Sequence, residues 1–203
     1  MSISYPLSLP TNKSAQRVTI SAMVAVAVSR SPSSYAQQVQ RFSGQKWKAE
    51  VTLPPMARAD AEEWIAFLLK LNGPEGTFLL GDPAAKTPRG TAGGSPLING
   101  ASQTGQTIIT DGWAHSETVL KRGDYIQLGQ RLYKALDDVT TDGSGNATFD
   151  IWPRLRESPA DNSTIITSSC VGLFRLTDSD YQIHSANADK NFTLGFSAEE
   201  ALS

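Results

Sequence analysis

The chain has few of the side chains that bind metals or form cross-links. Its 203 residues include a single cysteine, Cys170, and two histidines, His115 and His184. One thiol cannot form an internal disulfide, and it excludes a thiolate metal cluster. The histidines are far apart in sequence, and neither has partners at metal-ligand spacing. We therefore expect no metal site and no cofactor.

Excess charge and long hydrophobic runs are also missing. The chain carries 18 Lys and Arg against 20 Asp and Glu, a net charge of -2, which gives no electrostatic footprint for nucleic acid or an anionic membrane. No stretch approaches the ~20 apolar residues that span a bilayer, and Met1–Pro10 lacks the pattern of a secretion signal. We expect no membrane insertion, and synthesis in a reducing cytoplasm.

Patterns typical of catalytic sites do not occur. Ser31, Ser33 and Ser34 lie beside Pro32 in a predicted loop, and no glycine-flanked nucleophile elbow is present. The glycines from 90 to 100 lack the phosphate-binding spacing. Cys170 would need a base brought to it in space, whereas a single buried cysteine commonly packs as a small hydrophobe. We therefore expect no enzymatic activity and assign no catalytic residue.

Two short motifs have structural alternatives that we favour. Asp137, Asp138 and Asp142 with Gly143 resemble a calcium loop, but the alternating ligands and closing glutamate of that loop are missing. A solvated hairpin turn explains them better. The tripeptide Arg122-Gly123-Asp124 is known from cell adhesion, but it stands where the chain needs a turn. We predict a turn at both places.

Aromatic residues in the second half of the chain leave two interpretations open. They could stack bases or sugars if they lined one face, with cations between them, or they could fill the core of a small barrel or an interface. Tyr125 and Tyr133 lie in apolar stretches, which favours the core. The residues concerned are Trp113, Tyr125, Tyr133 and Trp152, with Lys121, Arg122, Arg131 and Lys134 interleaved.

Hydrophobic periodicity predicts β-strands in the first part of the chain. Every even position from Val18 to Val28 is apolar, and small apolar residues also occupy its later odd positions. We expect this strand to be covered on both faces, by a second sheet or by a neighbouring subunit. A second alternation runs from Trp47 to Leu53, after a turn predicted at Ser43-Gly44.

One helix is predicted after the second strand. Pro55 suits a first helical turn, and the residues Ala57, Ala61, Trp64, Ile65 and Leu68 share a face at helical spacing. Asn72, Gly73 and Pro74 would end the helix, with Gly73 able to take the left-handed conformation. A further strand is predicted at Thr77–Leu80.

The middle of the chain is predicted to form a separate unit. Glycines and prolines cluster between Gly81 and Gly100, as in a linker. Short apolar runs separated by turn signals then suggest a small barrel or sandwich; they are Thr107–Thr110, Tyr125–Leu128, Arg131–Leu136, Ala147–Trp152 and Ile165–Thr167. A lone strand, Phe192–Ala198, needs a sheet to join. The middle would then be an insertion between two halves of the first domain.

The chain resembles the distal tail proteins of long-tailed bacterial viruses. Three segments of the first part carry the resemblance, together with four segments of the second part. These are Trp47–Pro55, the helix with Trp64 and Phe67-Leu68, Gly76–Pro83, Gly123–Leu128, Leu132–Lys134, Ile151–Arg156 and Gly172–Arg175. The similarity covers most of the chain from about Val18 onward, and its motifs are structural, so no site residue follows from it.

The resemblance implies a mainly β chain with a defined architecture. A β-sandwich domain with one α-helix, residues 1–92 and 169–203, would form a hexameric ring at the distal end of the tail. An inserted OB-like β-barrel, residues 93–168, would point outward. The expected partners are further copies of the chain, the tail tube protein and the tail-tip or baseplate hub protein, with DNA as a transient passenger. The expected location is the virion.

Two other classes of function remain open at this point. The first is a carbohydrate- or host-surface-binding module of the tail tip, and the second is a single-strand nucleic-acid binder built on the barrel. Burial of Trp113, Tyr125 and Trp152 would weaken both alternatives.

Overall fold

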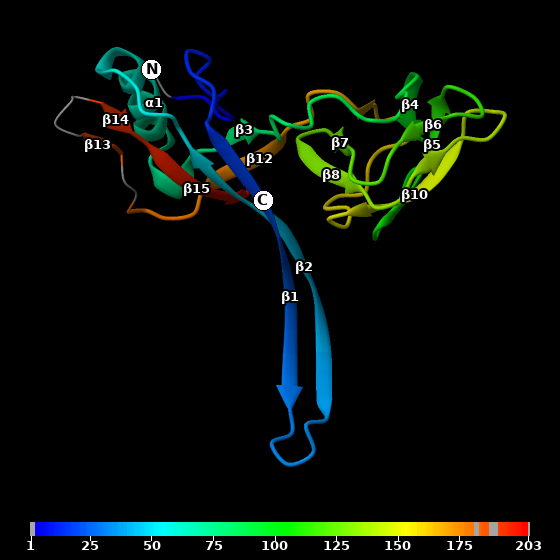
Figure 1. The fold of residues 1–203 in the computed structure, drawn as a ribbon. Coiled ribbons are helices and arrows are strands. Elements are labelled where there is room, and N and C mark those ends of the chain that lie inside the picture. Colours follow the sequence, from blue (N-terminus) through cyan, green and yellow to red (C-terminus); the bar gives the residue numbers. More distant parts are fainter. Residues whose placement is uncertain (1–2, 181–182, 187–190, 203) are drawn as a thin grey trace.

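A computed structural model describes residues 3–180, 183–186 and 191–202, which are mainly β with one α-helix. Both ends of the chain contribute to one antiparallel five-stranded sheet of order β1-β2-β15-β12-β3 (Figure 1). Its strands are β1 (Arg17–Arg30), β2 (Gln37–Thr52), β3 (Phe78–Leu80), β12 (Gly172–Leu176) and β15 (Gly195–Glu200). The late strand β15 therefore pairs with the early strand β2.

Helix α1 (Arg58–Leu71) buries Trp64, Ile65 and Leu68, as its apolar spacing predicts. The start predicted at Pro55 is wrong, because Met56 exchanges backbone hydrogen bonds with Phe192, which keeps this part of the chain out of the helix. The helix ends at Leu71, and the capping residue Asn72 takes the left-handed conformation that we predicted for Gly73. Gly73 also has a positive φ and begins a short 3-10 turn, η1 (Gly73–Glu75).

The middle of the chain forms a nearly closed, barrel-like sheet of six strands in the order β11-β7-β8-β10-β5-β4. The two edge strands approach each other where Leu97 bridges Thr164, and the Ile98 N–H donates to the Ser163 carbonyl. The strands are β4 (Gly94–Ile98), β5 (Thr107–Trp113), β7 (Tyr125–Leu128), β8 (Arg131–Ala135), β10 (Ala147–Trp152) and β11 (Ile165–Ile166). Two strand pairs stand apart, β6 (Thr118–Leu120) with β9 (Val139–Thr140), and β13 (Ser185–Ala186) with β14 (Phe192–Thr193).

The predicted linker from Gly81 to Gly100 is too long, because β4 lies inside it. Ile98 is fully buried in the barrel core although glycines surround it in sequence. Among the described residues, buried apolar side chains form two clusters, one around the five-stranded sheet and α1 and one inside the barrel. Tyr125, Leu132 and Trp152 from barrel strands pack on the first cluster, so the two units share a packed junction.

Strands β1 and β2 extend far beyond the sheet as a two-stranded ribbon (Figure 1). We call residues 21–45 the arm. The turn predicted at Ser43-Gly44 is wrong, because these residues lie within β2 beside a bulge between Val24 and Val26. The reversal occurs instead after Ser31, whose N–H donates to the Ala36 carbonyl.

Candidate interaction surfaces

The arm is exposed over most of its length. We expected cover on both faces of the strand, but from Met23 onward every residue of β1 is exposed, so no second sheet within the described part of the chain covers it. Its large exposed side chains, with exposed fractions of 43–80%, are Met23, Val24, Val26, Val28, Tyr35, Val39 and Phe42. Such a group of exposed apolar side chains is typical of an interaction surface.

The two faces of the arm differ in chemistry. Beyond the bulge, Val26 pairs with Arg41, Val28 with Val39, and Arg30 with Gln37. These six side chains share one face, because alternate residues of a strand point to the same side. Ala27, Gln40, Ser29 and Gln38 occupy the opposite face. One face is therefore apolar and cationic, and the other is small and polar.

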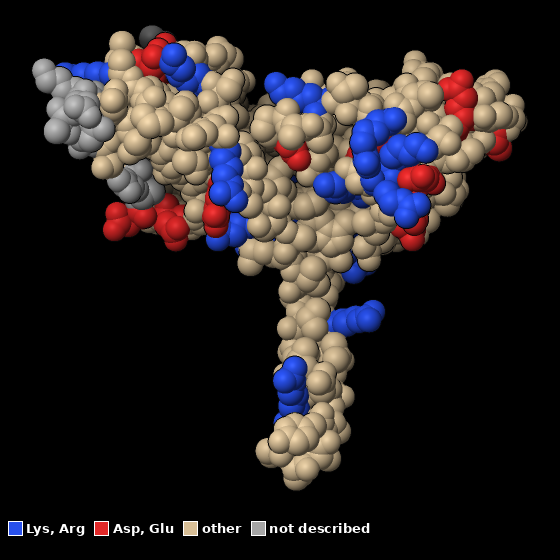
Figure 2. Space-filling model, in the orientation of Figure 1, with Lys and Arg blue, Asp and Glu red and all other residues tan. Residues whose placement is uncertain are grey.

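The arm carries positive charge only. Arg30 and Arg41 are its two charged residues, and neither has an ion-pair partner among the described residues. Figure 2 shows blue and no red on the visible side of the arm. Since the chain has a net charge of -2, the remainder carries the opposite, negative excess.

A cleft of about 460 Å³ lies where the arm meets the barrel. Val24, Val26 and Phe42 supply its apolar wall. Arg41 of the arm and Arg154 of the barrel supply its charge, and no acidic residue lines it among the described residues. The cationic face of the arm therefore continues onto the barrel.

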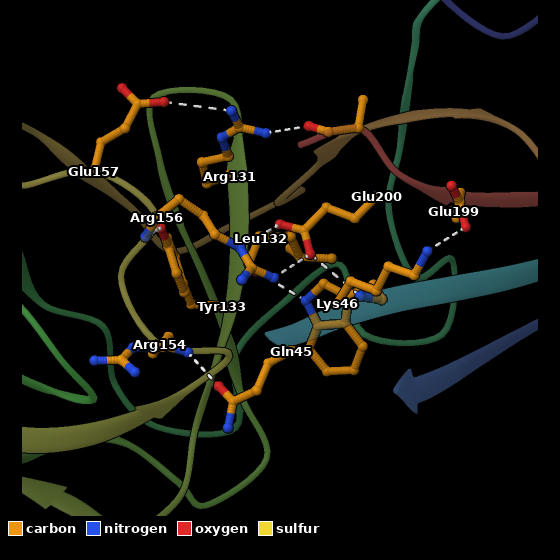
Figure 3. A network of polar contacts seen from close by, with 12 residues as sticks. Gln45, Lys46, Arg131, Leu132, Tyr133, Arg154, Arg156, Glu157, Glu199 and Glu200 are labelled. Carbon is orange, nitrogen blue, oxygen red and sulfur yellow. Dashed lines mark hydrogen bonds and ion pairs between the residues drawn. The ribbon is translucent and has the colours of Figure 1, made fainter. Parts of the chain in front are cut away.

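A buried polar network fixes the arm root against the barrel (Figure 3). The backbone N–H of Trp47 donates to Glu200 at 3.2 Å, and its indole Nε1 donates to the Leu132 carbonyl at 2.9 Å. Arg156 donates to the same Glu200 carboxylate at 2.7 Å, and that carboxylate is almost fully buried. Gln45 accepts a hydrogen bond from the Arg154 N–H at 2.8 Å. Strand β2, β15 and the barrel are thereby joined at one point.

The aromatic residues proposed as stacking platforms are not exposed. Trp113 and Tyr133 lie in the barrel core, and the Trp113 Nε1 donates to Thr110 at 2.8 Å. Trp152 packs edge-on against Trp47, with ring centroids 4.1 Å apart. Burial raises the pKa of Tyr125, and the neighbouring Asp82 carboxylate raises it further. These rings fill a core and a junction.

The tripeptide at residues 122–124 presents no free carboxylate. Asp124 is 4% exposed, and its Oδ2 accepts hydrogen bonds from the backbone N–H groups of Arg89, Gly90 and Lys121 at 2.8–3.2 Å. Arg89 also donates to Oδ1 through its Nε at 3.1 Å. Asp124 therefore joins the linker to a turn of the barrel, and its carboxylate is already hydrogen-bonded within the chain.

The other acidic motif is a turn. Asp142 Oδ1 accepts hydrogen bonds from the N–H groups of Ser144 and Asn146, each at 2.8 Å. Hydrogen bonds from Asn146 lower the pKa of Asp142, and the backbone N–H of Arg122 lowers that of Asp138. The two carboxylates thus accept hydrogen bonds from backbone N–H groups of the turns. Among the described residues, no cluster of three metal-ligating side chains occurs.

Cys170 and the histidines are separated in the structure. The Cys170 thiol contacts the carbonyls of Tyr125 and Ile166, and burial raises its pKa to about 11. His115 is exposed, and His184 packs on Phe192 with ring centroids 5.0 Å apart. The serines at 31–34 lie in the turn at the arm tip.

A groove on the five-stranded sheet was not foreseen from the sequence. It has a volume of about 370 Å³, and residues of β2, β12 and β15 and the segment after β12 line it. Glu50, Asp178 and Asp180 line it, without a Lys or Arg among its described lining residues. We call it the acidic groove. Asp178 and Asp180 lie 128 residues or more from Glu50 in sequence, so no local pattern places them together.

Within the described part of the chain, no helix is long and apolar enough to cross a membrane. No protein-family model matches the chain, and no curated protein sequence matches it significantly.

Proposed function

We propose that the chain is a structural subunit of a long-tailed bacteriophage, a distal tail protein whose ring joins the tail tube to the tip or baseplate and lets DNA pass. The observation that carries this proposal is the arm, a long apolar ribbon that its own chain leaves uncovered. An isolated two-stranded ribbon is marginally stable in water, so it needs a partner. A subunit of a permanent assembly supplies one.

The finer architecture belongs to the same proposal. The ring-forming domain would comprise residues 1–92 and 169–203 as a β-sandwich, with α1 and the β13–β14 pair against the five-stranded sheet. Residues 93–168 would be an inserted OB-like barrel pointing outward. The pairing of β15 with β2, and the separate apolar core of the barrel, support this division.

Assembly would proceed through one repeated head-to-tail contact. Such a contact closes into a ring when its rotation fits, and a tube end is cyclic. Six copies would form the ring, with the tail tube protein on one side and the hub protein on the other. The apolar face of the arm is the candidate contact, and no catalytic or cofactor site is part of the function.

Electron microscopy of intact particles tests the proposal directly. Particles carrying a tagged copy of this chain should show the label as a ring at the distal end of the tail. A tagged tube protein is the control, since its label should run along the whole tail. A label on the capsid, or tails of normal length and tip in the absence of this chain, would rule the proposal out.

The carbohydrate-binding alternative gains no support from the barrel. Its candidate platforms Trp113, Tyr125 and Tyr133 are buried, and Trp152 packs on Trp47. We therefore do not propose sugar recognition through these rings.

A further inference from the structure

We propose that the cationic, apolar face of the arm of one copy docks in the acidic groove on the sheet of the next copy. This inference rests on the ring-forming function proposed above and names the two surfaces that meet.

The arm needs a partner with negative charge. Its apolar face presents Val26, Val28 and Val39 between Arg30 and Arg41. Both arginines are exposed and without ion-pair partners among the described residues. Exposure of these three valines to water costs free energy, and association with a partner removes that cost.

The acidic groove supplies that charge. Asp178 and Asp180 are exposed, and Thr177 donates a hydrogen bond to Asp178 at 2.8 Å. Glu50 is also exposed and pairs with Lys48 at 3.5 Å, which leaves the two aspartates as the excess. The two arginines of the arm are thus matched by two groove aspartates that have no ion-pair partner among the described residues.

An arm cannot reach the groove of its own chain. Strand β2 runs without interruption from the arm into the sheet that carries the groove, and the two arm strands pair from Arg17 to Arg30. The bonds of Trp47 to Glu200 and Leu132 fix the root of the arm. The arm projects away from the sheet (Figure 1). The groove that it enters must therefore belong to another chain.

A second copy fits the arm better than a nucleic acid or a lipid surface. Every copy carries one arm and one acidic groove, so the contact uses different surfaces on the two partners and can repeat around a ring. Opposite charges across such a contact guide association and fix the register of the partners. Polyanion binding would use only the two arginines and leave the groove without a role.

Charge reversal on each surface tests the contact. The arm variant carries Arg30→Glu and Arg41→Glu, and the groove variant carries Asp178→Lys and Asp180→Lys. All four side chains are on exposed residues, so both variants should fold, which circular dichroism will verify. The readout is self-association in sedimentation velocity over a concentration series, at low and at physiological salt.

We expect the unaltered chain to associate and each variant alone to remain monomeric. Mixing the two variants should restore association, because each arm then finds a groove of opposite charge in the other variant. The control is the pair Arg58→Glu and Glu62→Lys on α1, which also reverses an exposed ion pair and should leave association unchanged.

Four results would overturn the docking. The first three are an unaltered chain that stays monomeric throughout the series, association that is insensitive to either reversal, and mixed variants that fail to associate. Binding of the monomer to duplex DNA or to phosphatidylglycerol vesicles through Arg30 and Arg41 would also overturn it.

If the docking is overturned but the chain still forms a ring in the tail, only the docking fails. If the docking is verified but the label is absent from tails, only the tail function fails.

Discussion

At the scale of single residues, Asp124 is the side chain with the clearest structural task. Its Oδ2 accepts three backbone N–H groups while the carboxylate is almost fully buried. Asp124→Asn replaces one acceptor oxygen with a donor, which leaves buried N–H groups unsatisfied. We expect a loss of about 1–3 kcal/mol in the free energy of unfolding, measured by urea denaturation.

Asp137→Asn is the matched control, because Asp137 is exposed and lies near the same turn. It should change stability by less than about 0.5 kcal/mol. Equal effects of the two substitutions would show that Asp124 does not fasten the linker.

The thiol of Cys170 gives a second residue-scale prediction. Thiolate is the reactive form of cysteine, and burial raises the pKa of this group to about 11. We expect the native protein to react slowly with a disulfide reagent at neutral pH, and faster as the pH rises toward that value. The urea-unfolded chain is the control and should react at the rate of an ordinary thiol. Fast labelling of the native protein would contradict the buried position.

At the scale of elements, the substitution Val26→Asp tests assembly of the chain separately from its folding. Val26 is 45% exposed in the arm, so Val26→Asp buries no charge within its own chain. We expect an unchanged thermal unfolding midpoint together with lost self-association, measured by calorimetry and sedimentation. Val51→Asp is the contrasting variant, because Val51 is 2% exposed and a buried unpaired charge should prevent folding. A destabilised Val26→Asp protein would mean that the arm packs against its own chain.

The elements also show what the sequence could predict. Strands β7 and β10 have their predicted bounds, and α1 ends where expected, because apolar spacing reports local structure. Strand β2 begins at Gln37, ten residues before the predicted start at Trp47. The sequence did not predict this part because Gln37–Arg41 has little apolar alternation. Its pairing with β1 keeps it extended. Apolar periodicity also cannot say what covers a strand. The same alternation describes a buried strand and the exposed arm, and the acidic groove depends on long-range pairing that no local pattern contains.

At the scale of the whole molecule, the net charge predicts how a ring would treat DNA. Six copies at -2 would total six times -2, or -12, so the proposed ring would repel DNA on average. The barrel cations are also engaged: Arg131 donates to the Ala201 carbonyl, and Lys134 lies 4.4 Å from the Tyr125 ring centroid. We expect no measurable duplex or single-strand binding at physiological salt in fluorescence anisotropy. Salt-sensitive binding at micromolar concentration would favour the nucleic-acid-binding alternative.

The position of β2 between β1 and β15 sets an order of events during synthesis. The arm and strand β2 leave the ribosome before the barrel strands, but β15 is synthesised after all of them. Contacts between such distant segments form late, whereas the barrel strands lie close together in sequence. The nascent chain therefore exposes one side of β2 as well as the arm until β15 has been synthesised. During that interval the same ribbon that would join finished subunits is a site for premature aggregation, which chaperones must prevent.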